Sequence, residues 1–289
     1  MSRGATPGPA LTLHVEVAGH APAPDVDTFL LIHGYGASTF SWRYWAPRLA
    51  ERGHVVMLDM KGFGRSPKPD DGRYAPEHQA ELVQRVIAER DLQRLTLVGH
   101  SLGGGVALLA ALHLLEGDAR RLERLVVVAG AAYDQKLPPF VKLADHPRAS
   151  SLFFRVLGAE RVVRGVLTSI VHARGRVDEA QVRGYAAPLE SPDAVRALIA
   201  SARQIRPDGL EHLTARYPQL DVPALLLWGR HDRVVPLWVG QRLARDLPDA
   251  HLHVLEACGH IPAEELPEES WQVLESFLDE RGPRPAGSA

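Results

Sequence analysis

The chain has 289 residues, of which 45% are hydrophobic and 24% charged, the balance of a folded globular protein. Its formal net charge of -2 offers no basic surface for a nucleic acid or an anionic membrane. No apolar run approaches the ~20 residues of a membrane span, residues 1–9 lack the apolar core of a signal peptide, and the one cysteine, Cys258, excludes an internal disulfide, so we expect a cytoplasmic protein.

Short apolar segments alternate with longer amphipathic ones along the first half of the chain. Alternating residues predict an edge strand at 11–17, and continuous apolar runs predict buried strands at 28–32, 54–58, 95–98 and 125–129. Helical spacing of apolar residues predicts helices at 42–51, 76–90 and 102–115. This alternation indicates an α/β fold with a mostly parallel central sheet flanked by helices.

The pattern changes between residues 133 and 216, where prolines separate amphipathic segments and no strand is convincing. Helices are predicted there at 149–157, 159–171 and 193–204. Strands resume at 224–228 and 251–255, which favours an inserted helical lid over a separate C-terminal helical domain. We therefore predict a core in two parts, residues 1–132 and 217–280, separated by a lid at 133–216 and followed by a flexible tail at 281–289. The second part of the core is predicted to end in a helix at 267–280.

The motif G-x-S-x-G at residues 99–103 stands between an apolar strand and an Ala/Leu-rich helix. The motif alone is weak, because glycine and serine are common. Between a buried strand and a helix, however, the motif indicates a nucleophile elbow. In such a turn the flanking glycines let the strand and the helix approach closely, and the serine hydroxyl is exposed above the sheet. Ser101 is therefore the candidate nucleophile; as an alternative, it caps the following helix.

Two further loops carry side chains suited to nucleophilic catalysis by a serine. Such catalysis needs a base to take the hydroxyl proton and a carboxylate to orient that base. Asp232 follows the strand at 224–228, and His260 follows the strand at 251–255. Asp134, just past the strand at 125–129, is the alternative acid, and a turn-capping role is the alternative for Asp232.

Taken together, these segments resemble the α/β-hydrolase fold proteins, over nearly all of the chain outside the lid and the two ends. The resemblance rests on five segments in the expected order, at 30–38, 59–66, 99–103, 228–236 and 257–262. It implies Ser101 as nucleophile, His260 as general base and then acid, Asp232 as the residue that orients His260, and a covalent acyl-enzyme. It also suggests that His33 and His100 brace loops rather than transfer protons.

The position of the elbow also predicts the donors that stabilise the oxyanion. The backbone N–H of Leu102 follows the nucleophile at the start of a helix. The second donor is expected from the loop after the strand at 28–32, where we predict the N–H of Tyr35, with Gly36 as the alternative. We expect no metal and no cofactor, because the sequence lacks a zinc-type ligand cluster and a phosphate or dinucleotide loop.

A serine at the elbow disfavours epoxide opening and dehalogenation, because relatives with those activities carry a carboxylate there. The predicted activity is hydrolysis of carboxylic esters of small to medium acyl chain, with a small-molecule ester or related acyl compound as substrate. The alternatives are a carbon–carbon bond hydrolase of the meta-cleavage-product type and an acyltransferase or perhydrolase on the same fold. A non-catalytic ligand-binding homologue is disfavoured, because all three residues of the triad are present.

Overall fold

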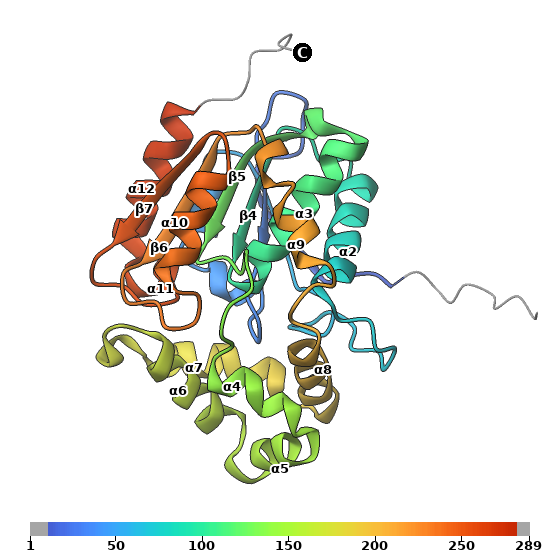
Figure 1. The fold of residues 1–289 in the computed structure, drawn as a ribbon, viewed down its shortest axis with the longest axis vertical. Coiled ribbons are helices and arrows are strands. Elements are labelled where there is room, and N and C mark those ends of the chain that lie inside the picture. Colours follow the sequence, from blue (N-terminus) through green and yellow to red (C-terminus); the bar gives the residue numbers. More distant parts are fainter. Residues whose placement is uncertain (1–10, 282–289) are drawn as a thin grey trace, which may run out of the picture.

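The computed structural model describes residues 11–281, which contain a seven-stranded sheet of order β1-β3-β2-β4-β5-β6-β7 (Figure 1). β1 is antiparallel to β3, and the other neighbours pair in parallel, which confirms the predicted fold class. The strands are β1 (Val15–Gly19), β2 (Thr28–Ile32), β3 (His54–Leu58), β4 (Leu95–His100), β5 (Leu122–Val128), β6 (Ala224–Gly229) and β7 (Ala250–Leu255).

The predicted strands 28–32 and 54–58 have the observed bounds of β2 and β3. The edge strand predicted at 11–17 is displaced toward the C-terminus, because β1 pairs residue for residue with β3 and takes its limits from that strand. The helix predicted at 42–51 is divided into a 3-10 turn, Thr39–Trp42, and α1, Ala46–Ala50. Pro47 lies in the first turn of α1, where its missing N–H costs nothing.

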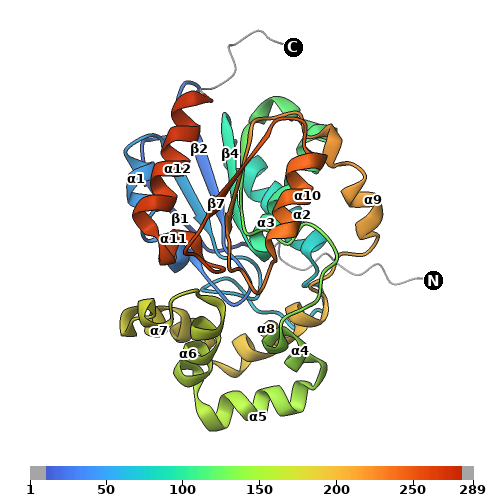
Figure 2. The ribbon, with the colours of Figure 1, turned by 60° about the vertical axis from the view of Figure 1, so that its left-hand side comes forward.

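Helices cover both faces of the sheet, so the central strands β2 to β6 are buried on two sides, whereas the edge strands β1 and β7 are partly exposed (Figures 1 and 2). Alternate side chains of one strand enter opposite cores: Leu30 and Ile32 belong to one apolar cluster, and Phe29 and Leu31 to the other. The first cluster is covered by α2 (Pro76–Glu89), α3 (Leu102–Gly117) and α10 (Leu237–Asp246), and the second by α1, α11 (Pro262–Glu265) and α12 (Pro267–Glu280).

The described chain between β5 and β6 contains helices and no strand. In both views α4 to α8 lie together beyond the carboxyl ends of the parallel strands, whereas α9 lies beside the α/β layers (Figures 1 and 2). That these residues act as a lid stays a prediction. The helices are α4 (Pro139–Lys142), α5 (Pro147–Leu157), α6 (Ala159–Ile170), α7 (Glu179–Ala186), α8 (Pro192–Arg203) and α9 (Leu210–Thr214).

Buried polar groups join α7 to the α/β layers. The Glu264 carboxylate in α11 accepts hydrogen bonds from the Gln181 amide (2.9 Å) and the Tyr185 hydroxyl, and it pairs with Arg43 at 2.6 Å. Burial raises the pKa of Glu264, and these three donors oppose that rise. The Tyr185 ring also packs edge-on against Phe40. These contacts fix one side of the helical segment to the core.

No helix among the described residues has both the length and the apolarity that a bilayer crossing requires. The N-terminal residues 1–9 and, apart from Arg281, the predicted tail lie outside the described residues.

Close packing of α3 on β2 generates the first prediction. A Cβ added at Gly103 would overlap the backbone carbonyl oxygens of Ile32 and His33, which cannot retreat without disturbing the sheet. We expect Gly103→Ala to lower the free energy of unfolding by roughly 1–3 kcal/mol, as overpacking does, measured by thermal or urea denaturation. Gly117→Ala in the same helix is the control, because an added Cβ there meets nothing; an equal loss in both variants would contradict the packing argument.

Candidate active site

Ser101 occupies the sharp turn between β4 and α3. Its backbone has φ 55° and ψ -119°, a conformation that a residue with a side chain rarely adopts and that costs about 1–3 kcal/mol. Hydrogen bonds on both sides hold it there: its N–H donates to the carbonyl oxygen of Val128 (2.9 Å), and its carbonyl accepts from the N–H groups of Ala131 (2.9 Å) and Gly104 (3.0 Å). The turn thereby presents the hydroxyl to the cavity above the sheet.

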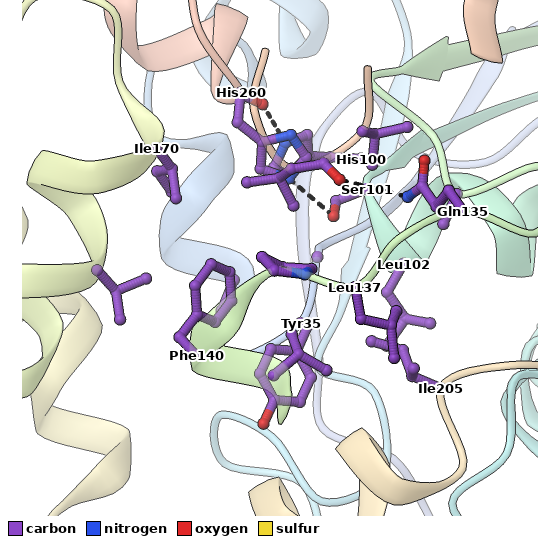
Figure 3. A pocket seen from close by; sticks show the side chains of 18 of the residues that line it. Tyr35, His100, Ser101, Leu102, Gln135, Leu137, Phe140, Ile170, Ile205 and His260 are labelled. Atoms are coloured by element: carbon purple, nitrogen blue, oxygen red, sulfur yellow. Dashed lines mark hydrogen bonds between the residues drawn. The ribbon is translucent and has the colours of Figure 1, made fainter. Parts of the chain in front are cut away.

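The structure brings the three residues of the predicted triad together. His260 Nε2 lies 2.9 Å from Ser101 Oγ (Figure 3), and His260 Nδ1 lies 2.8 Å from Asp232 Oδ2. An ionised Asp232 accepts from Nδ1–H, which leaves Nε2 as the acceptor for the serine hydroxyl. The exposed fractions are 8% for Ser101, 7% for Asp232 and 4% for His260, so the chain of hydrogen bonds is shielded from bulk water.

The carboxylate of Asp232 is fixed by its own loop. Its Oδ1 accepts hydrogen bonds from the N–H groups of Val234 (2.8 Å) and Val235 (2.9 Å), which leaves Oδ2 directed at His260. The turn-capping role and the triad contact therefore coexist in one side chain. Asp134 lies near the same site, but its side chain is 70% exposed and pairs with Arg206 at 3.0 Å rather than with His260.

The two histidines expected to brace loops do so. His33 contacts the carbonyl of Gly34 (2.8 Å) through Nδ1 and accepts the N–H of Met60 (3.0 Å) at Nε2. His100 Nε2 donates to the carbonyl oxygen of His260 (2.8 Å), which holds the backbone of the catalytic-histidine loop. Burial lowers the pKa of His100 to about 3, helped by the nearby His260, so this ring is neutral at physiological pH.

Glu265 is a site residue that the sequence interpretation did not single out. Its buried carboxylate accepts the N–H groups on either side of His260, from Gly259 (3.0 Å) and Ile261 (3.3 Å), and that of His172 just after α6 (2.7 Å). The carboxylate therefore holds the His260 backbone and ties it to the helical segment. In the sequence, a glutamate in the first turn of a helix is typical of a solvated surface, so nothing marked it.

A cavity of about 100 Å³ opens above Ser101. Leu102, the first residue of α3, and Tyr35, in the loop after β2, both line it, and the role of their N–H groups as oxyanion donors stays a prediction. Gly36, the alternative donor, lines a neighbouring cleft instead. Apolar side chains form most of the wall, among them Leu137, Phe140, Ile170 and Ile205 (Figure 3).

Two polar groups of this wall stand out. Gln135 donates from its amide nitrogen to the carbonyl of Val234 (3.4 Å), while its buried Oε1 has no hydrogen-bond partner in the protein. Among the described residues that line the cavity, Arg206 is the one arginine or lysine, and its side chain is 53% exposed. Within residues 11–281, no three histidine, cysteine, aspartate or glutamate side chains converge as a metal site would.

Cys258 precedes the histidine loop and is fully buried. Burial raises the pKa of its thiol, and the negative charges of Glu265 and Asp232 raise it further. The thiolate is therefore suppressed, which agrees with the interpretation of Cys258 as a packed residue.

Comparison with known proteins gives a consistent result. Residues 27–267 match the family model described as the alpha/beta hydrolase fold. The chain is 32% identical to the uncharacterized hydrolase YugF of Bacillus subtilis over 90% of this chain and 92% of that protein. It is 30% identical to the 2-hydroxymuconate semialdehyde hydrolase of Pseudomonas sp. (strain CF600) over 80% and 79%. Its fold is similar to that of an esterase from Exiguobacterium antarcticum, with a TM-score of 0.76, 22% identity and coverage of 92% and 95%.

The contact between Asp232 and His260 predicts which acid supports turnover. Asp232→Asn should lower kcat by about 10³–10⁴, because an amide that keeps its bonds to the loop favours the wrong imidazole tautomer, as in other serine triads. Asp134→Asn is the matched control and should stay within about twofold of wild type. Steady-state kinetics with an activated ester measure both; a crippled Asp134→Asn with an active Asp232→Asn would reverse the assignment.

The contacts of Glu265 predict a positioning role for this carboxylate. Glu265→Gln keeps the shape but turns an NH₂ group toward backbone N–H donors, so we expect kcat to fall by about tenfold or more while KM changes little. Glu268→Gln, an exposed glutamate nearby in the chain, is the control. Steady-state kinetics separate kcat from KM, and an unchanged kcat in a folded Glu265→Gln protein would refute the role.

Proposed function

We propose that this chain, which belongs to the alpha/beta hydrolase fold family, is a serine hydrolase that cleaves carboxylic esters of small to medium acyl chain. One observation carries the proposal: Ser101, His260 and Asp232 form a continuous hydrogen-bonded relay at 2.9 and 2.8 Å beneath an apolar cavity. The relay supplies a nucleophile, a base and an orienting charge, and the chemistry requires no cofactor.

The proposed reaction has two halves. Ser101 Oγ attacks the ester carbonyl carbon and passes its proton to His260 Nε2, while Asp232 stabilises the imidazolium. The N–H groups of Leu102 and Tyr35 bind the oxyanion of the tetrahedral intermediate. The carbon–oxygen bond then breaks, and the alcohol leaves with the proton from His260. Water, deprotonated by His260, cleaves the acyl-enzyme in the same way and releases the acid.

Hydrolysis of a carbon–carbon bond is the second candidate. It is favoured by the 30% identity to a 2-hydroxymuconate semialdehyde hydrolase. Substrates of the meta-cleavage-product type carry a carboxylate, which calls for a cation in the substrate cavity that can pair with it. The cavity offers Arg206, whose half-exposed guanidinium already pairs with Asp134 at 3.0 Å. This scarcity of free positive charge in the cavity supports the ester hydrolase.

Acyl transfer is a third outcome of the same acyl-enzyme, with an alcohol, a thiol or hydrogen peroxide as the acceptor in place of water. Such acceptors compete for one intermediate, so an added alcohol diverts product from the acid to a new ester. This partition distinguishes an acyltransferase or perhydrolase from a hydrolase.

The proposal predicts turnover of p-nitrophenyl esters that depends on Ser101. We expect wild type to hydrolyse the short and medium acyl members, measured by release of p-nitrophenolate. Ser101→Ala should reduce kcat by at least about 10³ and remain folded, since removing the small hydroxyl leaves the turn in place. Circular dichroism and thermal melting serve as the control for folding.

Assays of alternative substrates complete this experiment. A vinylogous keto acid is the alternative substrate, and its consumption is measured as the loss of its visible absorbance. If folded wild type leaves every ester intact but consumes this keto acid, the carbon–carbon hydrolase replaces the ester hydrolase as the proposed function. Ester turnover that persists in Ser101→Ala would refute the serine mechanism for either substrate.

A further inference from the structure

A second and larger space lies beside the catalytic cavity, within the helical segment. Its volume is about 630 Å³, against about 100 Å³ for the cavity above Ser101. Residues from α4, α5, α6 and α8 form its walls, together with the loop at Tyr35 and Gly36. We call this space the α6 cleft, because residues along the whole length of that helix line it.

The α6 cleft is apolar. Val162, Val166 and Ile170, on successive turns of α6, contribute to one wall, and Phe153 and Phe154 of α5 to another. Among the described residues that line it there is no carboxylate, and the charged ones are Arg161 and Arg233, both exposed. A space of this size and lining suits the hydrocarbon part of a ligand.

The cleft and the catalytic cavity share a wall. Tyr35, Phe140, Ile170 and Tyr185 are among the residues that line both spaces, so one layer of side chains separates them. Figure 3 shows Phe140 and Ile170 on the side of Ser101 opposite to Gln135. Phe140, which lines both spaces, is only partly buried.

We propose that the α6 cleft binds the distal part of a linear acyl chain whose ester carbonyl lies at Ser101. This inference rests on the proposed ester hydrolase and names the substrate class. A cavity of roughly 150 Å³ holds a benzene ring, so the catalytic cavity alone accepts only a short acyl group. A medium chain needs further space, and the α6 cleft supplies apolar space in contact with the same cavity wall.

Two variants test the α6 cleft without touching the catalytic cavity. Val162 and Gly165 line the cleft but not the cavity, and an added Cβ at Gly165 meets no atom. Val162→Trp and Gly165→Leu therefore both narrow the cleft, the first by a large side chain and the second by a smaller one. Gly117→Leu in α3 is the matched control, because it too is a helical glycine with open space around an added Cβ, far from the cleft.

The measurement is kcat/KM for methyl esters of linear acids from two to twelve carbons, followed by acid release in a pH-stat. We expect wild type and Gly117→Leu to gain about fourfold per methylene once the chain enters the cleft. Val162→Trp should hydrolyse the two- and four-carbon esters within about twofold of wild type and lose at least tenfold on the eight- and ten-carbon esters. Gly165→Leu should show a smaller loss of the same kind. Thermal melting checks that each variant is folded.

The outcomes separate this inference from the proposed function. Serine-dependent hydrolysis of short esters with the same length profile in wild type, Val162→Trp and Gly165→Leu would overturn the α6 cleft and leave the ester hydrolase standing. A loss of equal size at every chain length would also overturn it, because it would reflect damage to the catalytic cavity. Folded wild type that hydrolyses no ester would overturn both.

Discussion

The strained turn at Ser101 is the constraint on which the site depends. A side chain at φ 55° is unfavourable, and the fold maintains it because β4 and α3 are both packed into the cores and their backbones approach closely at Gly99 and Gly103. The residues that flank the nucleophile therefore fix the conformation of the turn. With the turn fixed, the Ser101 side chain projects above the sheet, and the other members of the site are placed relative to it.

The parallel sheet places those other members. The carboxyl ends of β4, β6 and β7 meet at one edge, which brings together loops that are 159 residues apart in the chain. Buried hydrogen bonds then set the orientation of each side chain. The Asp232 carboxylate accepts N–H groups of its own turn. The His260 backbone is held by His100, which binds its carbonyl oxygen, and by Glu265, which binds the N–H groups of the adjacent residues. Many of the buried hydrogen bonds at this edge of the sheet thus hold the backbone of the catalytic loops in position.

The helical segment between β5 and β6 adds apolar walls beside the triad. Glu264 binds α7 to the α/β layers through Arg43, Gln181 and Tyr185, and the Glu265 carboxylate beside it binds the chain just after α6. Two neighbouring buried carboxylates therefore connect this segment to the histidine loop. Residues of α4 and α6 line the cavity, and residues of α4, α5 and α6 line the α6 cleft. Under the proposed function, this segment contributes to the choice among substrates.

The sequence by itself determined the sheet strands, the elbow and the candidate triad, because these depend on local patterns: apolar runs, a G-x-S-x-G at a strand end, and polar residues after strands. The sequence favoured Asp232 and left Asp134 as the alternative acid, and the tertiary structure places Asp232 beside His260 and Asp134 beside Arg206. Glu265 and the α6 cleft were beyond the sequence for the same physical reason. Their roles arise from contacts between segments distant in the chain, and such contacts exist only when the chain is packed.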